Sequence, residues 1–376
     1  MKLAIIGDGQ LGRMLAQAAN PLAIECVALN PGDLKVRCPL TGRVLGEGLA
    51  ALTDGADHLT FESEHIPLAM AEALAPNHSF NPSPRSLIAM GDRLGERQLL
   101  SSLNIPCSPW RAVHSAADVR TAEAELGYPL YLKRTHGGYD GRGQWRLTAP
   151  DDLPDDLLTL LAEGVTVLAE AHVPFKRELS ILAARGRDGQ MVFYPLAENI
   201  HHQGILHASL APAPDSERWQ TLANQWVQAV AEQLDHVGML AIELFDIGDG
   251  LLVNELAPRV HNSGHWSQLG CSHSQFENHI RAVCALPLQP PVSHGLTLML
   301  NVLGEQPVTA LAHSRGAQYH WYNKEPRPGR KLGHINFNAA DAAALRQQLS
   351  GLSKLAGPTL TTTLALAEAR LAELSA

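Results

Sequence analysis

The stretch Leu132-Lys133-Arg134-Thr135-His136-Gly137-Gly138-Tyr139-Asp140-Gly141-Arg142-Gly143 decides how the chain is interpreted. It places a lysine at the end of an apolar run, ahead of a glycine-rich loop with one acid inside. Glycine lets the backbone approach a ligand closely, so successive amide groups can converge on an anion. The composition therefore indicates a phosphate-binding loop. It is not a Walker A loop, because there the lysine follows the glycines. An ordinary hairpin loop is the alternative, since glycine clusters often mark turns.

A pair of glutamates is the second signal. Residues 237–246 and 251–255 read as two strands joined by a Gly248-Asp249-Gly250 turn. A three-residue loop places Glu243 opposite Glu255. Opposed like charges destabilise a sheet, so this pair calls for a cation. Mg²⁺ is commonly held by one or two carboxylates together with substrate phosphates, which connects the hairpin to the glycine loop. The alternative is that one glutamate lies at the rim and faces water.

Bulk composition bounds the class of protein. With 376 residues, 45% hydrophobic and 18% charged, the chain is expected to form two or three domains. A net charge of -9 and a pI of about 6.0 argue against nucleic acid or an anionic membrane as partner. We expect a cytoplasmic protein, because no apolar run approaches about 18 residues. The five cysteines are scattered and never spaced Cys-x-x-Cys, so we expect them to be packing residues.

The glutamate hairpin, the lysine and the glycine loop, followed by Asn254-Glu255-Leu256-Ala257-Pro258-Arg259, together resemble the ATP-grasp superfamily. Five motifs in order narrow the resemblance to the 5-(carboxyamino)imidazole ribonucleotide synthase family of purine biosynthesis. They are Gly7-Asp8-Gly9-Gln10-Leu11-Gly12-Arg13-Met14, Phe61-Glu62-Ser63-Glu64, residues 137–144, Pro258-Arg259-Val260-His261-Asn262-Ser263-Gly264-His265-Trp266 and Arg327-Pro328-Gly329-Arg330-Lys331. The resemblance covers nearly the whole chain and is weakest over residues 31–58. Ser63 also departs from the bulky apolar residue expected there.

The resemblance implies an α/β chain, α+β overall, with the ATP-grasp fold. We expect an N-terminal Rossmann-like domain with a parallel sheet over residues 1–85. An ATP-grasp domain follows over 86–290, with a lid at about 108–173. A small C-terminal mixed β domain over 291–376 is expected to complete the active site.

Local patterns place several elements more closely. A helix over 10–19 lies between strands at 3–6 and 24–29, as expected for parallel pairing. A single helix is predicted over 86–103, and an alanine-rich helix near 363–374.

The family resemblance also implies the reaction. ATP and bicarbonate would form carboxyphosphate, which breaks down to carbon dioxide and phosphate. The amine of 5-aminoimidazole ribonucleotide would then capture the carbon dioxide as a carbamate. ATP and Mg²⁺ are the implied cofactors, with Mg²⁺ on Glu243 and Glu255, and the family is commonly a homodimer. The implied nucleotide-binding positions are Arg93, Lys133, Gly138, Tyr139, Asp140, Gly141, Arg142, Gly143, Gln144, Glu170, Ala171, His172, Val173, Glu178, His201, Asn254 and Glu255.

A second set of positions is implied for the ribonucleotide and the chemistry. The substrate-binding residues would be Gly9, Gln10, Leu11, Glu62, Tyr139, His261, Asn262, Arg327, Arg330 and Lys331. Asp140 is the candidate for orienting or deprotonating the amine, Lys324 for steadying the carboxylate group, and Arg259 is the third catalytic candidate. The basic run 324–331 could instead be a solvated loop. In an acidic protein we interpret it as a collector of phosphate and carboxylate.

Other classes of function stay open at this point. Gly7-x-Gly9-x-x-Gly12 matches the dinucleotide pattern of nicotinamide oxidoreductases, but Asn30 stands where an acid should bind the ribose. What remains is a helix N-terminus able to bind an anion. The motif His261-x-x-x-His265 could suggest zinc, although the intervening Ser263-Gly264 disfavours a continuous helix. A formate-dependent glycinamide ribonucleotide transformylase and a non-catalytic nucleotide sensor are the remaining rivals.

Overall fold

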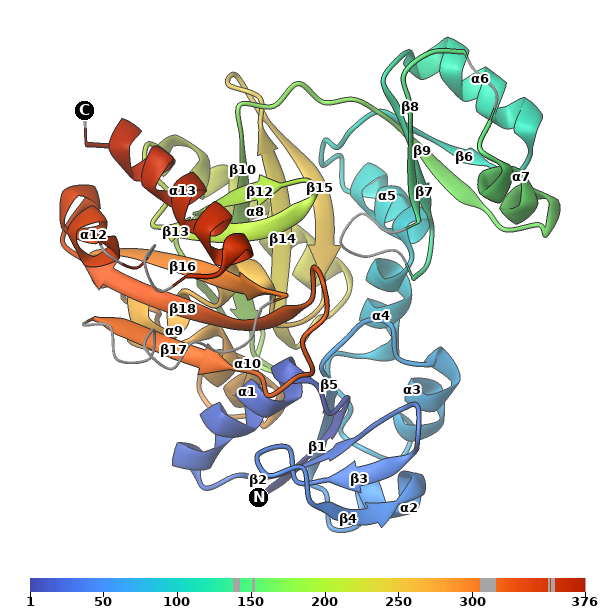
Figure 1. Ribbon diagram of the computed structural model, residues 1–376. Coiled ribbons are helices and arrows are strands. Elements are labelled where there is room, and N and C mark those ends of the chain that lie inside the picture. The colour runs from blue at the N-terminus through green and yellow to red at the C-terminus, as the bar shows by residue number, and fades with distance from the viewer. Residues whose placement is uncertain (138–142, 151–152, 305–315, 351, 353–355, 376) are drawn as a thin grey trace.

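The computed structural model describes residues 1–137, 143–150, 153–304, 316–350, 352 and 356–375. Figure 1 shows an N-terminal unit at the bottom, a small unit at the upper right, and a large central sheet that the C-terminal strands join at the left. Within the described ranges, no helix has both the length and the apolar character needed to cross a membrane.

The N-terminal unit contains a mixed sheet with the strand order β4-β3-β2-β1-β5. Its strands are β1 (Lys2–Ile6), β2 (Glu25–Leu29), β3 (Lys35–Arg37), β4 (Val44–Glu47) and β5 (His58–Phe61), and its helices are α1 (Gln10–Ala19), η1 (Asn20–Leu22), α2 (Gly48–Thr53) and α3 (Leu68–Leu74). β1 pairs in parallel with β2 and β5, but β3 and β4 pair antiparallel. The expected parallel pairing is confirmed for β1, β2 and β5, and the sheet also contains antiparallel pairs at β3 and β4. Only residues 30–34 separate β2 from β3, too few for the crossover that parallel pairing requires.

Two helices, not one, connect this unit to the rest of the chain. The structure contains α4 (Pro84–Gly91) and α5 (Arg93–Ser102), with Asp92 in an extended conformation between them. The Asp92 carboxylate accepts a hydrogen bond from the Leu94 amide at 3.1 Å and so caps α5. The predicted single helix over 86–103 is wrong because of this cap. The break places Arg93 at the first position of α5.

The small unit is an antiparallel sheet of strand order β6-β9-β7-β8, covered by two helices. Its elements are β6 (Trp110–Val113), α6 (Ala116–Leu126), β7 (Leu130–Arg134), β8 (Gln144–Leu147), α7 (Asp155–Ala162) and β9 (Val167–Ala171). Apolar residues of the strands and helices form a core of their own. The glycine-rich loop connects β7 to β8, and in Figure 1 this unit stands apart from the central sheet. We call it the lid.

The central sheet has the strand order β15-β14-β10-β12-β13-β16-β18-β17, with β11 paired to β10. Its strands are β10 (Arg177–Arg185), β11 (Met191–Phe193), β12 (Ala197–His202), β13 (Ile205–Ala211), β14 (Gly238–Asp246), β15 (Leu251–Ala257), β16 (Leu296–Leu303), β17 (Ala317–Trp321) and β18 (Lys331–Ala339). Alternate residues of β14 face opposite cores. One core holds α8 (Glu217–Gln233) and α5, and the other holds α1 and α10 (Gln275–Val283).

The C-terminal strands extend the central sheet. β16 pairs antiparallel with β13, so the strands of the expected C-terminal domain continue the central sheet. The helices α12 (Ala342–Leu349) and α13 (Pro358–Glu373) cover one face of this part. α13 begins earlier than residue 363 because Pro358 occupies its first turn, a position that suits proline.

Candidate active site

The two glutamates of the hairpin face each other, as predicted, but by a different route. Asp246 pairs with Leu251, so the turn is one residue longer than the expected three. The register then shifts beside Glu243, where Asn254 is an extra, unpaired residue of β15. This is a β-bulge, in which two residues of one strand oppose one of the other. The two offsets cancel, and Glu243 lies opposite Glu255.

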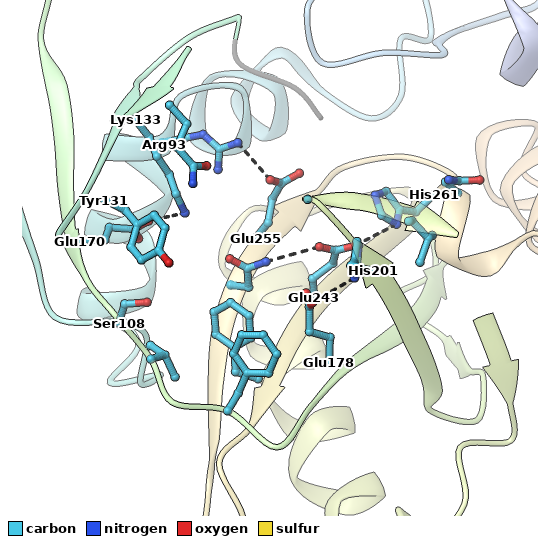
Figure 2. Close-up of a pocket in the computed structure, with 18 of the residues that line it drawn as sticks. Arg93, Ser108, Tyr131, Lys133, Glu170, Glu178, His201, Glu243, Glu255 and His261 are labelled. Atoms are coloured by element: carbon cyan, nitrogen blue, oxygen red, sulfur yellow. Dashed lines mark hydrogen bonds and ion pairs between the residues drawn. The ribbon is translucent and has the colours of Figure 1, made fainter. Parts of the chain in front are cut away.

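A cavity of about 700 Å³ lies between the lid and this hairpin. In Figure 2, Lys133 and Arg93 point toward it from one side, and Glu243 and Glu255 from the other. The nucleotide and metal residues predicted from the sequence that line it are Arg93, Lys133, Gln144, Glu170, Ala171, His172, Val173, Glu178, His201, Glu243, Asn254 and Glu255. Residues from the lid, α5, β10, β12 and the hairpin therefore meet around one space.

Lys133 reaches the cavity from β7 and pairs with a buried acid. Its Nζ lies 2.6 Å from Oε2 of Glu170 on β9. Burial alone would raise the pKa of the Glu170 carboxyl, but the charges of Lys133 and Arg97 outweigh it and lower the pKa to about 2. Two cations, Lys133 and Arg97, thus engage the Glu170 side chain.

The two hairpin carboxylates differ in their surroundings. Burial raises the pKa of Glu243 to about 7, and the charges of Glu255 and Glu178 add to the effect. For Glu255, burial is outweighed by the Arg93 guanidinium at 3.2 Å, so its pKa is lowered. Both side chains line the cavity, so neither lies only at a solvent rim. The negative charge of Glu243 is therefore less favourable in this site than that of Glu255.

A cation between these carboxylates would relieve that cost. Mg²⁺ accepts oxygen ligands and keeps several waters, so two carboxylates suffice when phosphate oxygens complete the shell. In the described part of the chain, no group of three or more His, Cys, Asp or Glu side chains could hold a metal without such help. The donor set fits a hard ion that arrives with a phosphate ligand.

The histidines near the cavity do not form a zinc site. His201 Nδ1 lies 3.0 Å from Glu178, and although burial alone would lower the pKa of His201, the acids Glu178 and Glu243 outweigh burial and raise it. Burial, reinforced by the charge of Arg259, lowers the pKa of His261 to about 3. His265 is fully buried against Gln275, and its pKa is also far below the usual range. The chain between His261 and His265 is a short 3₁₀ turn, η2 (Asn262–Gly264).

A second cavity of about 280 Å³ adjoins the first. It is lined by Gln10, Leu11, Glu62, Ser63, Arg259, His261, Asn262, His265 and Lys331, which include most of the residues predicted to bind the ribonucleotide. Arg259, His261, Asn262 and Lys331 line both cavities. These four residues therefore form a shared wall between the two spaces.

The N-terminus of α1 is occupied by a side chain of the protein itself. The Glu62 carboxylate accepts hydrogen bonds from the amides of Gly9 at 2.7 Å and Gly12 at 2.6 Å. A Cβ on Gly7 or Gly9 would overlap the Glu62 side chain, so these glycines make room for it. The sequence-based expectation of a free anion site at this helix is wrong, because Glu62 supplies the anion. The same contact removes the amides that a dinucleotide pyrophosphate would need.

The basic run near residue 324 divides into two groups. Lys324 donates to the side chain of Gln10, a residue that lines the second cavity, and burial with the charge of Arg330 lowers the pKa of Lys324 to about 8. Lys331 lines both cavities. Arg327 is exposed, and Arg330 donates to the Glu325 carbonyl at 3.1 Å. These two arginines line neither cavity, contrary to expectation.

Arg259 forms an ion pair with Glu64, an acid that the sequence did not predict to be part of the site. Its Nη2 donates to Glu64 at 2.8 Å and its Nε donates to the other Glu64 oxygen. Burial would raise the pKa of Glu64, but Arg259 lowers it to about 2. The bidentate pair connects the segment after β5 to the segment after β15 and fixes Arg259 in the shared wall.

Aromatic lining residues were also missed. Phe175 and Phe245 stack with ring centroids 4.6 Å apart and an interplanar angle of 9°, and both line the first cavity with Tyr131 and Ser108. Alternation along a strand could have found two of them, because Phe245 is two residues from Glu243 and Tyr131 is two from Lys133. Phe175 gives no such signal.

Several predicted residues lie outside the described part of the chain, namely Gly138, Tyr139, Asp140, Gly141 and Arg142. Gly143 is described. Its φ is +67°, and a Cβ at this position would clash with the Arg134 side chain. Gln144 begins β8 and lines the first cavity.

Three family models match the chain in order. Residues 1–90 match the ribonucleotide synthetase preATP-grasp domain, residues 98–276 the ATP-grasp domain, and residues 297–348 the phosphoribosylaminoimidazole carboxylase C-terminal domain.

Full-length relatives and solved structures agree with these matches. The chain is 44% identical to the N5-carboxyaminoimidazole ribonucleotide synthase of Vibrio cholerae over 94% of this chain and 95% of the relative. It is 39% identical to that of Escherichia coli over 95% and 96%. The crystal structure of the Thermus thermophilus synthetase superposes with a TM-score of 0.85 at 39% identity, covering 95% of this chain and 99% of that one. The Aspergillus clavatus synthase in complex with ADP and 5-aminoimidazole ribonucleotide gives 0.83 at 27% identity, covering 94% and 98%.

Proposed function

Because the chain belongs to the N5-carboxyaminoimidazole ribonucleotide synthase family of ATP-grasp enzymes, we infer that its two cavities serve the two halves of that reaction. The enzyme is a ligase of purine biosynthesis. It uses ATP and bicarbonate to convert 5-aminoimidazole ribonucleotide into its N5-carboxy derivative, with release of ADP and phosphate. The assignment of roles to residues below is our proposal.

The shared wall is the observation that carries the proposal. Arg259, His261, Asn262 and Lys331 line both spaces, so a group made in one can be captured in the other without crossing bulk water. Carboxyphosphate is short-lived, and a closed route between the cavities would protect it. A lid that stands apart from the central sheet provides the means of closing the site.

ATP is proposed to occupy the larger cavity. The base would lie near Tyr131 and the stacked Phe175 and Phe245, against the backbone of residues 170–173. The phosphates would lie toward Lys133 and the hairpin carboxylates, together with the amides of the glycine-rich loop. Phosphoryl transfer needs mainly positioning and charge neutralisation, which this arrangement supplies.

Mg²⁺ is proposed to bind Glu243 and Glu255 with phosphate oxygens. The raised pKa of Glu243 supports this, because a buried carboxylate beside another acid favours a cation. When bound, the ion would neutralise charge on the transferring phosphoryl group. Arg93 would hold Glu255 in place from the other side, at 3.2 Å.

The ribonucleotide is proposed to occupy the smaller cavity. Each Glu62 oxygen already accepts one amide, which leaves a lone pair on each for a sugar hydroxyl and disfavours a phosphate at that point. Lys331 and Lys324 are the cations proposed to meet the phosphate and the new carboxylate. Asp140 is proposed to orient or deprotonate the amine, and Arg259 and Asn262 to guide carbon dioxide toward it.

The test is ADP release by the purified protein with MgATP and bicarbonate, with and without 5-aminoimidazole ribonucleotide. We expect release that rises with the ribonucleotide, needs no formate, and is lost in Glu255→Ala. Removing a positioned charged group from such a site costs on the order of 2.7 to 4 kcal/mol of barrier. Dependence on formate would indicate a transformylase. Absence of ATP turnover with intact MgADP binding would indicate a nucleotide sensor.

Two broader proposals concern assembly and compartment. We propose a homodimer, supported by the exposed apolar side chains Leu34, Val44 and Leu45 around β3 and β4. Light scattering on the eluted protein tests it. We also propose a cytoplasmic location, which suits a chain whose five cysteines are all free thiols.

A further inference from the structure

Arg97 on α5 is a fully buried arginine that lines neither cavity. A buried guanidinium is costly unless its donors are paired. Its exposed fraction is 0%, and that of its neighbour Glu96 is 2%. Arg97 lies at the junction between two sheets, so its bonding partners show which elements it connects.

The Arg97 guanidinium holds three elements together. Its Nε and Nη2 lie 2.8 and 2.7 Å from Oε1 of Glu170, on the last strand of the lid. Its Nη2 also donates to the Asn254 carbonyl at 2.6 Å, on β15 of the central sheet. Its Nη1 donates to Glu96 on its own helix. The planar guanidinium fork can serve all of these acceptors at once, which an ammonium cannot.

Glu96 makes a second contact with the backbone of β15. Its second oxygen accepts a hydrogen bond from the Leu256 amide at 3.1 Å. Arg97 and Glu96 therefore hold the backbone on both sides of Glu255, at the residue before it and the residue after it.

These contacts of Arg97 and Glu96 with β15 lie at the β-bulge. Asn254 has no partner across the hairpin, so Arg97 satisfies a carbonyl that the bulge leaves out of regular pairing. Without the bulge, Glu243 would oppose Asn254, and Glu255 would turn to the other face of the sheet. The register that brings the two carboxylates together is the one that Arg97 and Glu96 stabilise.

On the lid side, the same guanidinium orients the lysine. Glu170 receives Arg97 on Oε1 and Lys133 on Oε2. The position of Lys133 thus depends on a carboxylate that Arg97 fixes. One buried side chain is connected to both the phosphate-binding lysine and the second metal carboxylate.

We propose that Arg97 is a positioning residue that sets Lys133 and Glu255 relative to each other across the joint between the lid and the central sheet. The proposal rests on the proposed function, because it takes Lys133 and Glu255 as ATP and Mg²⁺ ligands. It predicts that changes at Arg97 affect Mg²⁺ and ATP, and leave the ribonucleotide site unaffected.

The first experiment compares Arg97→Lys with the wild-type enzyme in steady-state kinetics. We expect the Mg²⁺ concentration at half-maximal rate and the KM for ATP to rise about tenfold, because groups that orient metal ligands change metal affinity 10- to 100-fold when replaced. The KM for 5-aminoimidazole ribonucleotide should stay within about twofold. Arg185→Lys is the matched control, since Arg185 is mostly buried and bonds Asp235 at 2.8 Å and the His236 carbonyl at 3.0 Å, away from both cavities. It should change none of these constants.

Glu96→Gln provides a second variant should Arg97→Lys fail to fold. A glutamine has one acceptor oxygen where Glu96 uses two, so either Arg97 or the Leu256 amide loses its partner. We expect the same selective rise for Mg²⁺ and ATP. A fall in kcat with all three constants unchanged, in either variant, would mean a purely structural role and would overturn the proposal.

Calorimetric binding of MgADP separates this inference from the proposed reaction. Arg97→Lys should weaken MgADP binding about tenfold in the wild-type background, and by a smaller factor when Glu255→Gln is already present, because only the part that acts through Lys133 then remains. Equal losses in both backgrounds would contradict coupling through Glu255. If the wild-type protein bound MgADP without cleaving ATP, the proposed function would fail. The MgADP affinities in the two backgrounds would still test the positioning role of Arg97.

Discussion

Replacement of Glu243 by glutamine should stabilise the protein while it abolishes the activity. Glu243 lies opposite Glu255 in a buried site, and its pKa is raised from 4.5 to about 7, mainly by burial. Glutamine has the same shape and no charge, so it removes the cost of burying the anion. It also removes one of the two proposed metal ligands.

The magnitude follows from proton linkage. One pKa unit is worth about 1.4 kcal/mol, so a rise from 4.5 to about 7 corresponds to roughly 3 kcal/mol. Below pH 4.5 the carboxyl is neutral in the folded and the unfolded chain, and it costs nothing. Between pH 4.5 and about 7 the folded state holds the proton that the unfolded state has released, so stability falls as pH rises. Above pH 7 the full cost remains.

The assay is urea unfolding in EDTA at pH 5 and pH 8, for the wild-type chain, Glu243→Gln and the exposed control Glu163→Gln. We expect Glu243→Gln to be up to about 3 kcal/mol more stable than wild type at pH 8, with a much smaller gain at pH 5. Adding Mg²⁺ and ADP should stabilise only the chains that keep Glu243. A Glu243→Gln gain that is equal at both pH values, or matched by Glu163→Gln, would refute the reasoning.

Three further outcomes are expected. The pKa of Lys324 is lowered to about 8, so the lysine loses its charge as pH rises through that value, and the KM for 5-aminoimidazole ribonucleotide should then rise. In Lys324→Arg the arginine stays charged, so this KM should not change with pH up to about pH 9.5. Glu62→Gln replaces one acceptor by a donor facing the Gly9 or Gly12 amide, which should lower stability by about 1 to 3 kcal/mol in thermal unfolding and raise the ribonucleotide KM without changing that for ATP. Phe245→Ala removes the stacking partner of Phe175, so KM for ATP should rise about tenfold with the ribonucleotide KM unchanged, and an unaltered ATP KM would count against the base site.

The sequence predicted local elements well where the signal was local. The helix over 10–19 has the predicted bounds, because its turn signals and apolar spacing lie within a few residues. The break at Asp92 was missed although its capping role is also local, because the apolar spacing on both sides continues as if one helix ran through.

The glutamate pairing was predicted correctly from an incorrect turn. The longer turn and the bulge at Asn254 each shift the register by one, and only their cancellation brings Glu243 opposite Glu255. Bulges depend on what satisfies the displaced backbone, here Arg97, which is 157 residues away in the chain. No pattern within the hairpin contains that information.

Long-range contacts also explain the other errors at the site. Glu62 fills the α1 N-terminus from 53 residues beyond Gly9. Arg259 is held by Glu64, a residue 195 positions away in the chain, and no pattern around either residue predicts this pair. Arg327 and Arg330 were grouped with Lys331 by proximity in sequence, but the turn that precedes β18 directs them elsewhere.

The pairing of β13 with β16 limits how such enzymes can exchange parts. A chimera joined near residue 290 would have to pair β13 of one parent with β16 of the other inside one continuous sheet, and a poor fit there would leave two strand edges unpaired, where edges invite aggregation. The C-terminal segment, which supplies three of the nine strands, is therefore an integral part of the sheet and not a detachable specificity module. The connection between β17 and β18, which carries Lys324, is the smaller unit that recombination or engineering could replace without opening the sheet.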